Sequence, residues 1–226
     1  PKWEQAMINL GGGRQGMSID SRKSGRIIFD SPEIAQRLLD RILPFLRTFH
    51  IDRVVDQPLV TGLGPAKRGE VLQVSRLNER LRFLRYEGGD YFRPHWDGCY
   101  VTPDGSERSL FTLHLYLNGE GEQDLAELMP ALERVEKWHA EMGDDRPESN
   151  GTESLQTSDG PLLGGATAFI NRFSTINAVR VFPKTGSLLI FQQRNLMHSG
   201  DDVFRGIKYT MRTDVMYTTE QAQNGE

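Results

Sequence analysis

The chain has 226 residues, 37% of them hydrophobic and 26% charged, a composition that fits one globular domain with a substantial core. A formal net charge of -4 argues against nucleic acid as the main partner, because nucleic-acid-binding proteins usually carry a basic surface. The single cysteine excludes an intrachain disulfide and a multi-cysteine zinc site, and no apolar run is long enough to span a bilayer.

The N-terminal part of the chain predicts an irregular segment, a short strand and then a helix. Residues 1–26 are rich in Gly, Ser, Arg and Lys and are expected either to drape over a functional site or to stay mobile. A strand is predicted at 26–29. Asp30-Ser31-Pro32-Glu33 has the residues of a helix start, and Pro44 is expected to end or bend the helix. Its apolar positions recur at helical spacing: Ile34, Leu38, Leu39, Ile42, Leu43 and Leu46.

The middle of the chain predicts a loop followed by strands. Prolines and glycines make 54–69 loop-like, and strands are predicted at about 80–86, 91–97 and 110–117. In the last of these, leucines and Phe111 alternate with polar and aromatic residues, which indicates a strand with two distinct faces. We interpret His114 as a residue of one face rather than a metal ligand.

Residues 119–160 differ from their surroundings and are interpreted as an insertion. A helical stripe predicts a helix at about 125–142, and the polar run 143–160 is expected to be flexible. Four further strands are predicted, at 166–170, 178–182, 188–192 and 207–217. Many short strands with Gly/Pro turns predict a mainly β fold with flanking helices, a double-stranded β-helix (jelly roll) formed by a single domain over 1–226.

A pair of residues in the strand region has the chemistry of a metal site. His95 and Asp97 lie two residues apart on an extended segment, so their side chains point to the same side. A second histidine would complete a 2-His-1-carboxylate triad, which suits oxygen activation at Fe(II), and His198 is the candidate. The spacing alone is weak evidence, because His50-x-Asp52 and His139-x-Glu141 share it. Those two pairs lie at a helix end and within a helical segment, where a solvated surface role is expected.

Several motifs in order resemble the prolyl 4-hydroxylase-like family of Fe(II)/2-oxoglutarate dioxygenases. The resemblance covers roughly residues 75–118 and 162–217. The motifs that carry it are Tyr86-x-x-Gly-x-x-Tyr91-x-x-x-His95-x-Asp97, Gly164-Gly165, Pro183-x-x-Gly186-x-Leu188-Leu189-x-Phe191, His198-x-Gly200 and Gly206-x-Lys208-Tyr209.

The resemblance implies His95, Asp97 and His198 as Fe(II) ligands, with 2-oxoglutarate and O2 as cosubstrates and ascorbate as a further candidate cofactor. It also implies that Lys208 binds the far carboxylate of 2-oxoglutarate and that the phenol of Tyr86 hydrogen-bonds the same molecule. The charges of Fe(II), Asp97, 2-oxoglutarate and Lys208 cancel, as a dry pocket requires. Without this role, Lys208 would be read as a solvated strand lysine.

Four other residues are second-rank pocket candidates. Arg212 lies on the face of Lys208 and could support cosubstrate or substrate, or form a salt bridge with Asp214 or with an acid on another strand. The remaining candidates are Tyr91, Tyr116 and Thr167, for which core packing is the alternative.

The resemblance implies hydroxylation of a C–H bond, with release of succinate and carbon dioxide. Peptidyl proline is the family's best-known substrate, and oxidation of a free amino acid or small metabolite is the alternative. The partner is therefore a peptide or a small molecule. A catalytically silent jelly-roll binding module and a jelly-roll metalloprotein that does not use 2-oxoglutarate remain as other readings. Possible substrate contacts are Arg82, Arg93, Trp96, Arg172 and Arg194.

The long 119–160 connection departs from the family pattern and leaves the substrate open, because an insertion at a jelly-roll rim can act as a lid or a partner surface. The single cysteine favours a reducing compartment, cytoplasmic or nuclear. The chain begins at Pro1 without Met, so a targeting segment could precede it. The oligomeric state has no signature in the sequence.

Overall fold

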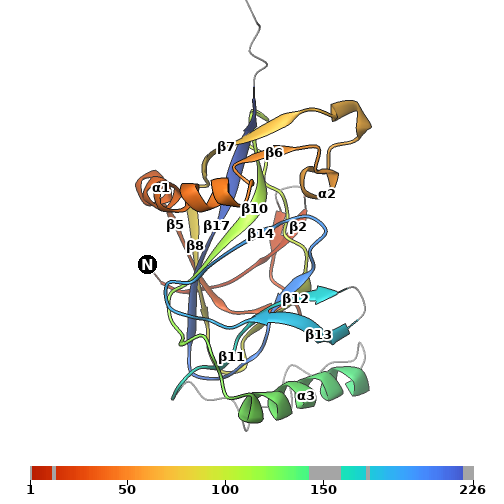
Figure 1. Ribbon diagram of the computed structural model, residues 1–226. Helices are drawn as coiled ribbons and strands as arrows, with labels where there is room; N and C mark the ends of the chain where they lie inside the picture. Colours follow the sequence, from red (N-terminus) through yellow and green to blue (C-terminus); the bar gives the residue numbers. More distant parts are fainter. Residues whose placement is uncertain (1, 12–13, 143–158, 172–173, 221–226) are drawn as a thin grey trace, which may run out of the picture.

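The computed structural model describes residues 2–11, 14–142, 159–171 and 174–220, and they form mainly antiparallel strands (Figure 1). The elements in chain order are β1 (Glu4–Gln5), β2 (Ile8–Gly11), β3 (Arg14–Gly16), β4 (Arg22–Lys23), β5 (Gly25–Asp30), α1 (Pro32–Thr48), β6 (Arg53–Val55), α2 (Pro58–Thr61), the short 3-10 helix η1 (Pro65–Lys67), β7 (Val71–Leu77), β8 (Arg80–Tyr86), β9 (Tyr91–His95), β10 (Glu107–Tyr116), α3 (Leu125–Met142), β11 (Leu163–Gly164), β12 (Thr167–Asn171), β13 (Ser174–Val181), β14 (Leu188–Gln192), β15 (His198–Gly200), β16 (Val203–Arg205) and β17 (Lys208–Thr219).

Helix α1 starts where the sequence predicts. The Ser31 side chain caps it by accepting a hydrogen bond from the backbone N–H of Ile34, with a proline in the first turn. The expectation that Pro44 ends or bends the helix was wrong as to its end, because α1 continues to Thr48. Ile42 and Leu46 are buried on either side of Pro44, and their packing holds the last turn on the core.

The major sheet has the strand order β1-β5-β8-β17-β10-β14, with β7 also pairing with β17 and β6 with β7. One of its faces packs against α1, which lies beside β5, β8 and β17 in Figure 1. The predicted alternation in β10 is confirmed, since Leu113 lies in that core while Thr112 and His114 are absent from it and turn the other way. The opposite face of β8, β10 and β17 is therefore free to line a site.

The minor sheet has the order β13-β12-β15-β9-β4. Strands β9 and β15 are antiparallel neighbours, and His95 is the direct partner of His198 in their register. The two sheets give the mainly β jelly roll that the sequence predicts. This pairing brings together two histidines that are far apart in the chain.

The N-terminal residues are more regular than expected. Instead of irregular structure, they form β1, which pairs with β5, the hairpin β2–β3, and β4, which pairs with β9. The expected loop at 54–69 likewise contains α2 and η1, and β7 was not predicted. Sheet edges offer unpaired N–H and C=O groups, so a polar segment with little hydrophobic pattern can still become a strand.

Helix α3 matches the predicted helix of the 119–160 segment. Its buried residues pack with Leu163 and Phe204 in a separate small core; they are Leu128, Ala131, Leu132 and Val135. Most of the polar run 143–160 lies outside the described residues. Within the described residues, no helix is both long and apolar enough to cross a membrane.

Candidate metal and cosubstrate site

His95, Asp97 and His198 come together in the structure. Their candidate ligand atoms all lie within 4.8 Å of one another. The Nε2 atom of His95 is 3.8 Å from Asp97 Oδ1, and the Nε2 atom of His198 is 3.6 Å from Asp97 Oδ2. The register of β9 and β15 sets the two imidazoles opposite each other, and Asp97 follows just beyond the end of β9.

The three side chains fit a divalent iron ion. The Nδ1 atom of His95 is 2.8 Å from the carbonyl oxygen of Arg93, and that of His198 is 3.2 Å from the carbonyl oxygen of Leu196. An Nδ1–H that donates to a carbonyl leaves the Nε2 lone pair for a metal. Burial lowers the pKa of His95 to about 3 and also lowers that of His198, so both are neutral ligands at pH 7. Two neutral imidazoles and one carboxylate form the donor set of a facial triad.

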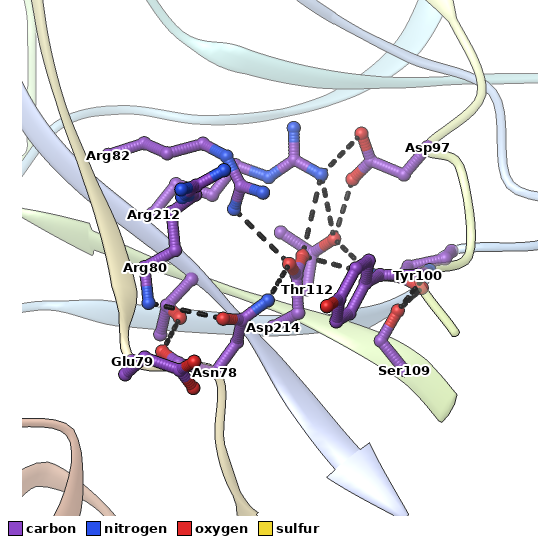
Figure 2. Close-up of polar contacts among 12 residues, drawn as sticks. Asn78, Glu79, Arg80, Arg82, Asp97, Tyr100, Ser109, Thr112, Arg212 and Asp214 are labelled. Atoms are coloured by element: carbon purple, nitrogen blue, oxygen red, sulfur yellow. Dashed lines mark hydrogen bonds and ion pairs between the residues drawn. The ribbon is translucent and has the colours of Figure 1, made fainter. Parts of the chain in front are cut away.

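Asp97 is held by two donors that the pair His95-x-Asp97 does not reveal (Figure 2). Arg212 Nη2 lies 2.8 Å from Oδ1, and the Thr112 hydroxyl donates to Oδ2 over 2.6 Å. Burial alone would raise the pKa of Asp97, but the Arg212 charge and the Thr112 hydrogen bond contribute to lowering it to about 2. Each carboxylate oxygen has two lone pairs, so Asp97 retains acceptor capacity for a metal.

Lys208 lies buried in the same cavity. Its Nζ donates to the carbonyl of Gly165 over 2.6 Å, and it lies 5.0 Å from the ring centroid of Tyr86. No carboxylate of the described residues lies within ion-pair distance of it, and burial lowers its pKa to about 8. Gly165 has φ +69°, and a Cβ there would lie 3.1 Å from Lys208 Cδ, which explains why a glycine suits this position. Tyr86 and Lys208 are direct partners across β8 and β17, and both line the cavity.

The second-rank candidates separate into two groups. Thr167 and Arg212 line the cavity. Tyr116 and Tyr91 do not: the Tyr116 hydroxyl is engaged by Thr167 Oγ1 at 2.7 Å, and the Tyr91 hydroxyl donates to the carbonyl of Ile19 at 3.0 Å. The pocket roles of these two tyrosines remain predictions, and the Tyr116 ring centroid lies 5.8 Å from Lys208 Nζ. Both hydroxyls already have hydrogen-bond partners, so neither has its hydroxyl free for a ligand in this structure.

The sequence reasoning missed two cavity residues. Arg22 reaches the cavity from β4, and nothing in a polar segment outside the recognised motifs pointed to it. His114 lines the cavity as well, and its Nε2 atom is buried without a hydrogen-bond partner. The period-2 relation of His114 to Thr112 on β10 is the signal that could have found it. Burial, with the nearby Lys208 charge, lowers the pKa of His114 well below its usual value, so this imidazole is neutral.

The two other His-x-acid pairs lie away from the cavity, and two of the possible substrate arginines form ion pairs with acids. His50 is exposed after α1, and His139 lies on α3. Arg93 pairs with Asp202 at 2.7 Å, and Arg82 pairs with Asp214 at 3.2 Å. Trp96 and Arg194 are exposed, and Arg172 is outside the described residues.

The comparisons with known proteins bear on the fold. No protein-family model and no curated protein matches this sequence. Among solved structures, a prolyl hydroxylase from Trichoplax adhaerens, in complex with a hypoxia inducible factor peptide fragment, matches with a TM-score of 0.50 and 14% identity, covering 99% of this chain and 74% of that one. A prolyl-4-hydroxylase from Pseudomonas putida matches with a TM-score of 0.48 and 16% identity, covering 94% and 76% of the two chains.

At this low identity the likeness concerns the fold. The Trichoplax adhaerens protein is matched over nearly the whole of this chain, so the likeness extends to the two sheets that hold the triad. This chain therefore has the jelly-roll fold of the prolyl hydroxylases, with a His-Asp-His triad positioned for metal binding.

Proposed function

We propose that this protein is an Fe(II)- and 2-oxoglutarate-dependent dioxygenase that hydroxylates a C–H bond. One observation carries the proposal: the His95, Asp97 and His198 triad shares a cavity with Lys208, a buried lysine that has no carboxylate partner among the described residues. A buried ammonium group is costly unless an anion compensates it. A dicarboxylate bound beside the metal would provide that anion.

His95, Asp97 and His198 would hold the iron. When bound, iron and 2-oxoglutarate supply the oxidation: one oxygen atom of O2 enters the substrate as a hydroxyl and the other enters succinate, with release of carbon dioxide. The Arg93 and Leu196 carbonyls orient the two imidazoles, and Thr112 and Arg212 orient the carboxylate.

The remaining cavity residues would bind the cosubstrate and keep water out. Lys208 would bind the far carboxylate of 2-oxoglutarate, and its nearness to the Tyr86 phenol supports a shared role for the two. Leu84, Phe92 and Phe191 provide apolar walls, which exclude water and strengthen electrostatic contacts inside.

The test of the reaction class is succinate release. With Fe(II) and 2-oxoglutarate, the protein should release succinate in an O2-dependent manner, and His198→Ala should abolish it. His50→Ala is the matched control, because it removes an exposed histidine outside the cavity. Release that continues unchanged in His198→Ala would exclude the proposed site.

The substrate class needs a separate experiment. A prolyl hydroxylase in complex with a peptide fragment is among the solved structures that resemble this chain, which supports a prolyl residue of a peptide. A free amino acid or small metabolite is the other candidate, and the buried guanidinium of Arg22 favours it because it could pair with a free carboxylate. Trapping oxygen-18 from labelled O2 in a peptide library and in a metabolite extract distinguishes them, and label confined to small molecules would exclude the prolyl peptide.

A further inference from the structure

Strand β4 carries a guanidinium group into the cavity. Arg22 is only 7% exposed and lies opposite Phe92 in the pairing of β4 with β9. Its Cζ atom is 4.4 Å from the centroid of the Phe92 ring. The His95 imidazole stacks on the same Phe92 ring, with 3.6 Å between the two ring centroids. Arg22 therefore lines the same cavity as the three candidate metal ligands but is not itself a ligand.

No described carboxylate forms an ion pair with Arg22. Its hydrogen-bond partners are neutral: Nε donates to Ser24 Oγ over 3.1 Å and Nη1 to the carbonyl of Met7 over 3.4 Å, and the neutral phenol of Tyr86 is a further neighbour. Other arginines near the site are matched with acids, as Arg93 is with Asp202 at 2.7 Å. Burial lowers the pKa of Arg22, but a guanidinium stays charged in proteins. Arg22 is thus a buried positive charge for which the described part of the chain supplies no anionic partner.

The cosubstrate does not account for this charge. 2-Oxoglutarate has two carboxylates, of which the far one is assigned to Lys208 and the near one to the metal. Fe(II), Asp97, Lys208 and 2-oxoglutarate then carry no net charge. Arg212 and Arg82 share Asp214 and leave one positive charge, and Arg22 adds another. The filled cavity would keep a positive surplus, which a buried site strongly disfavours.

We propose that the substrate is a small molecule with a carboxylate group, and that Arg22 binds this carboxylate. The inference rests on the proposed dioxygenase function and names its substrate class. A guanidinium presents a planar fork of donors that fits a carboxylate in a bidentate manner. A prolyl residue inside a peptide has an amide in place of the carboxylate, so it would leave Arg22 uncompensated. A free amino acid, or another compact carboxylic acid, meets the requirement.

The experiment compares acids with their carboxamides. Wild-type protein is loaded with Fe(II) and 2-oxoglutarate under anaerobic conditions and titrated calorimetrically with amino acids and N-acetyl amino acids, each paired with its carboxamide. At least one acid should bind about tenfold or more tightly than its amide, as expected for a charge-assisted pair. Equal binding within every pair, or no binding of any acid, would overturn the substrate class while leaving the dioxygenase reaction intact.

Variants then assign the preference to Arg22. Arg22→Gln and Arg22→Met should lose the preference for the acid while binding 2-oxoglutarate with nearly unchanged affinity. Lys23→Gln is the matched control, since Lys23 is the next residue on β4 and is exposed, where it pairs with Asp90 at 3.7 Å. This variant should keep the preference.

Each other outcome has a distinct meaning. A preference that survives in both Arg22 variants would refute the role of Arg22. Loss of 2-oxoglutarate binding in these variants, with metal still bound, would show that Arg22 serves the cosubstrate instead. Failure of the wild type to bind 2-oxoglutarate at all would refute the proposed function itself. The wild-type comparison of acid and amide needs no variant, so the substrate class stays testable even if both variants unfold.

Discussion

Arg212 and Asp97 form a buried ion pair, with 2.8 Å between Nη2 and Oδ1, so that a candidate iron ligand is also the anion of a salt bridge. Arg212 continues to Asp214 at 3.8 Å, and Asp214 accepts hydrogen bonds from Gln193 and Arg82 (Figure 2). This network fixes the orientation of the Asp97 carboxylate. It also places a permanent positive charge next to the metal site, which keeps Asp97 ionised.

Arg212→Gln is expected to destabilise the protein and shift the titration of Asp97. Breaking a buried pair costs roughly 3 kcal/mol, because charged partners are left uncompensated. Asp97 has a lowered pKa, so its contribution to stability is present above the unfolded pKa of about 3.9 and is lost as the pH falls toward 2. In the variant this loss should begin at a higher pH. Urea unfolding between pH 2 and 7 measures both effects.

Arg82→Gln is the control for this prediction. It removes another partner of Asp214, at 3.2 Å, while leaving the contact of Arg212 with Asp97 intact. Its acid titration should follow the wild type. An equal shift in both variants would mean that the network as a whole, and not the Arg212 contact, sets the pKa of Asp97.

His198→Ala is expected to weaken metal binding at least about 100-fold, because one of three protein ligands is lost. Titration with Mn(II), followed by electron paramagnetic resonance, measures the affinity without requiring turnover. His50→Ala should bind Mn(II) as the wild type does. Unchanged affinity in His198→Ala would remove this histidine from the ligand set.

Binding of 2-oxoglutarate should take up a proton above pH 8. Lys208 has a pKa lowered to about 8 by burial, so the empty site is largely deprotonated at pH 8.5. A bound carboxylate stabilises the ammonium form of Lys208 and raises its pKa. Binding should therefore take up about three quarters of a proton per site at pH 8.5 and almost none at pH 6.5. Calorimetry in buffers of different ionisation enthalpy counts the protons. The same count in Lys208→Met would assign the uptake to another group.

Asp90→Asn is expected to stabilise the protein at neutral pH. Burial raises the pKa of Asp90 to about 6, so its charged form is disfavoured in the folded state. The penalty is absent below the unfolded pKa of about 3.9 and complete only about one unit above pH 6, where it amounts to about 2 kcal/mol after an allowance for partial solvent screening. Asparagine can still accept the hydrogen bond from the Glu87 N–H. Thermal unfolding should show that Asp90→Asn is more stable than the wild type at pH 7.5 and nearly equal to it at pH 4. A stability gain of equal size at both pH values would not come from the ionisation of Asp90.

Tyr116→Phe should reduce stability by about 1 kcal/mol and leave 2-oxoglutarate affinity unchanged. The Tyr116 hydroxyl is buried and donates to Thr167 Oγ1, 2.7 Å away, so this hydrogen bond holds Thr167 and does not itself contact the cosubstrate. Chemical denaturation and calorimetric titration test the two parts separately. A large loss of 2-oxoglutarate affinity would return Tyr116 to the cosubstrate site.

The order of motifs in the sequence was sufficient to bring His95, Asp97, His198 and Lys208 into one predicted site, and the structure places them around one cavity. The local patterns that predict strands β8, β9, β10 and β14 are strong, because alternation of apolar and polar residues depends only on near neighbours. The start of α1 was predictable for the same reason, since a cap acts within one turn.

The sequence by itself therefore determined the jelly-roll class and the candidate ligands. Only the tertiary structure decided which partners the polar residues take: Arg212 reaches Asp97, 115 residues earlier in the chain, and Arg22 enters the cavity because β4 pairs with β9. A short polar segment carries no periodicity, and a buried charge selects its partner through the pairing of distant strands. Such choices depend on contacts that no local pattern encodes.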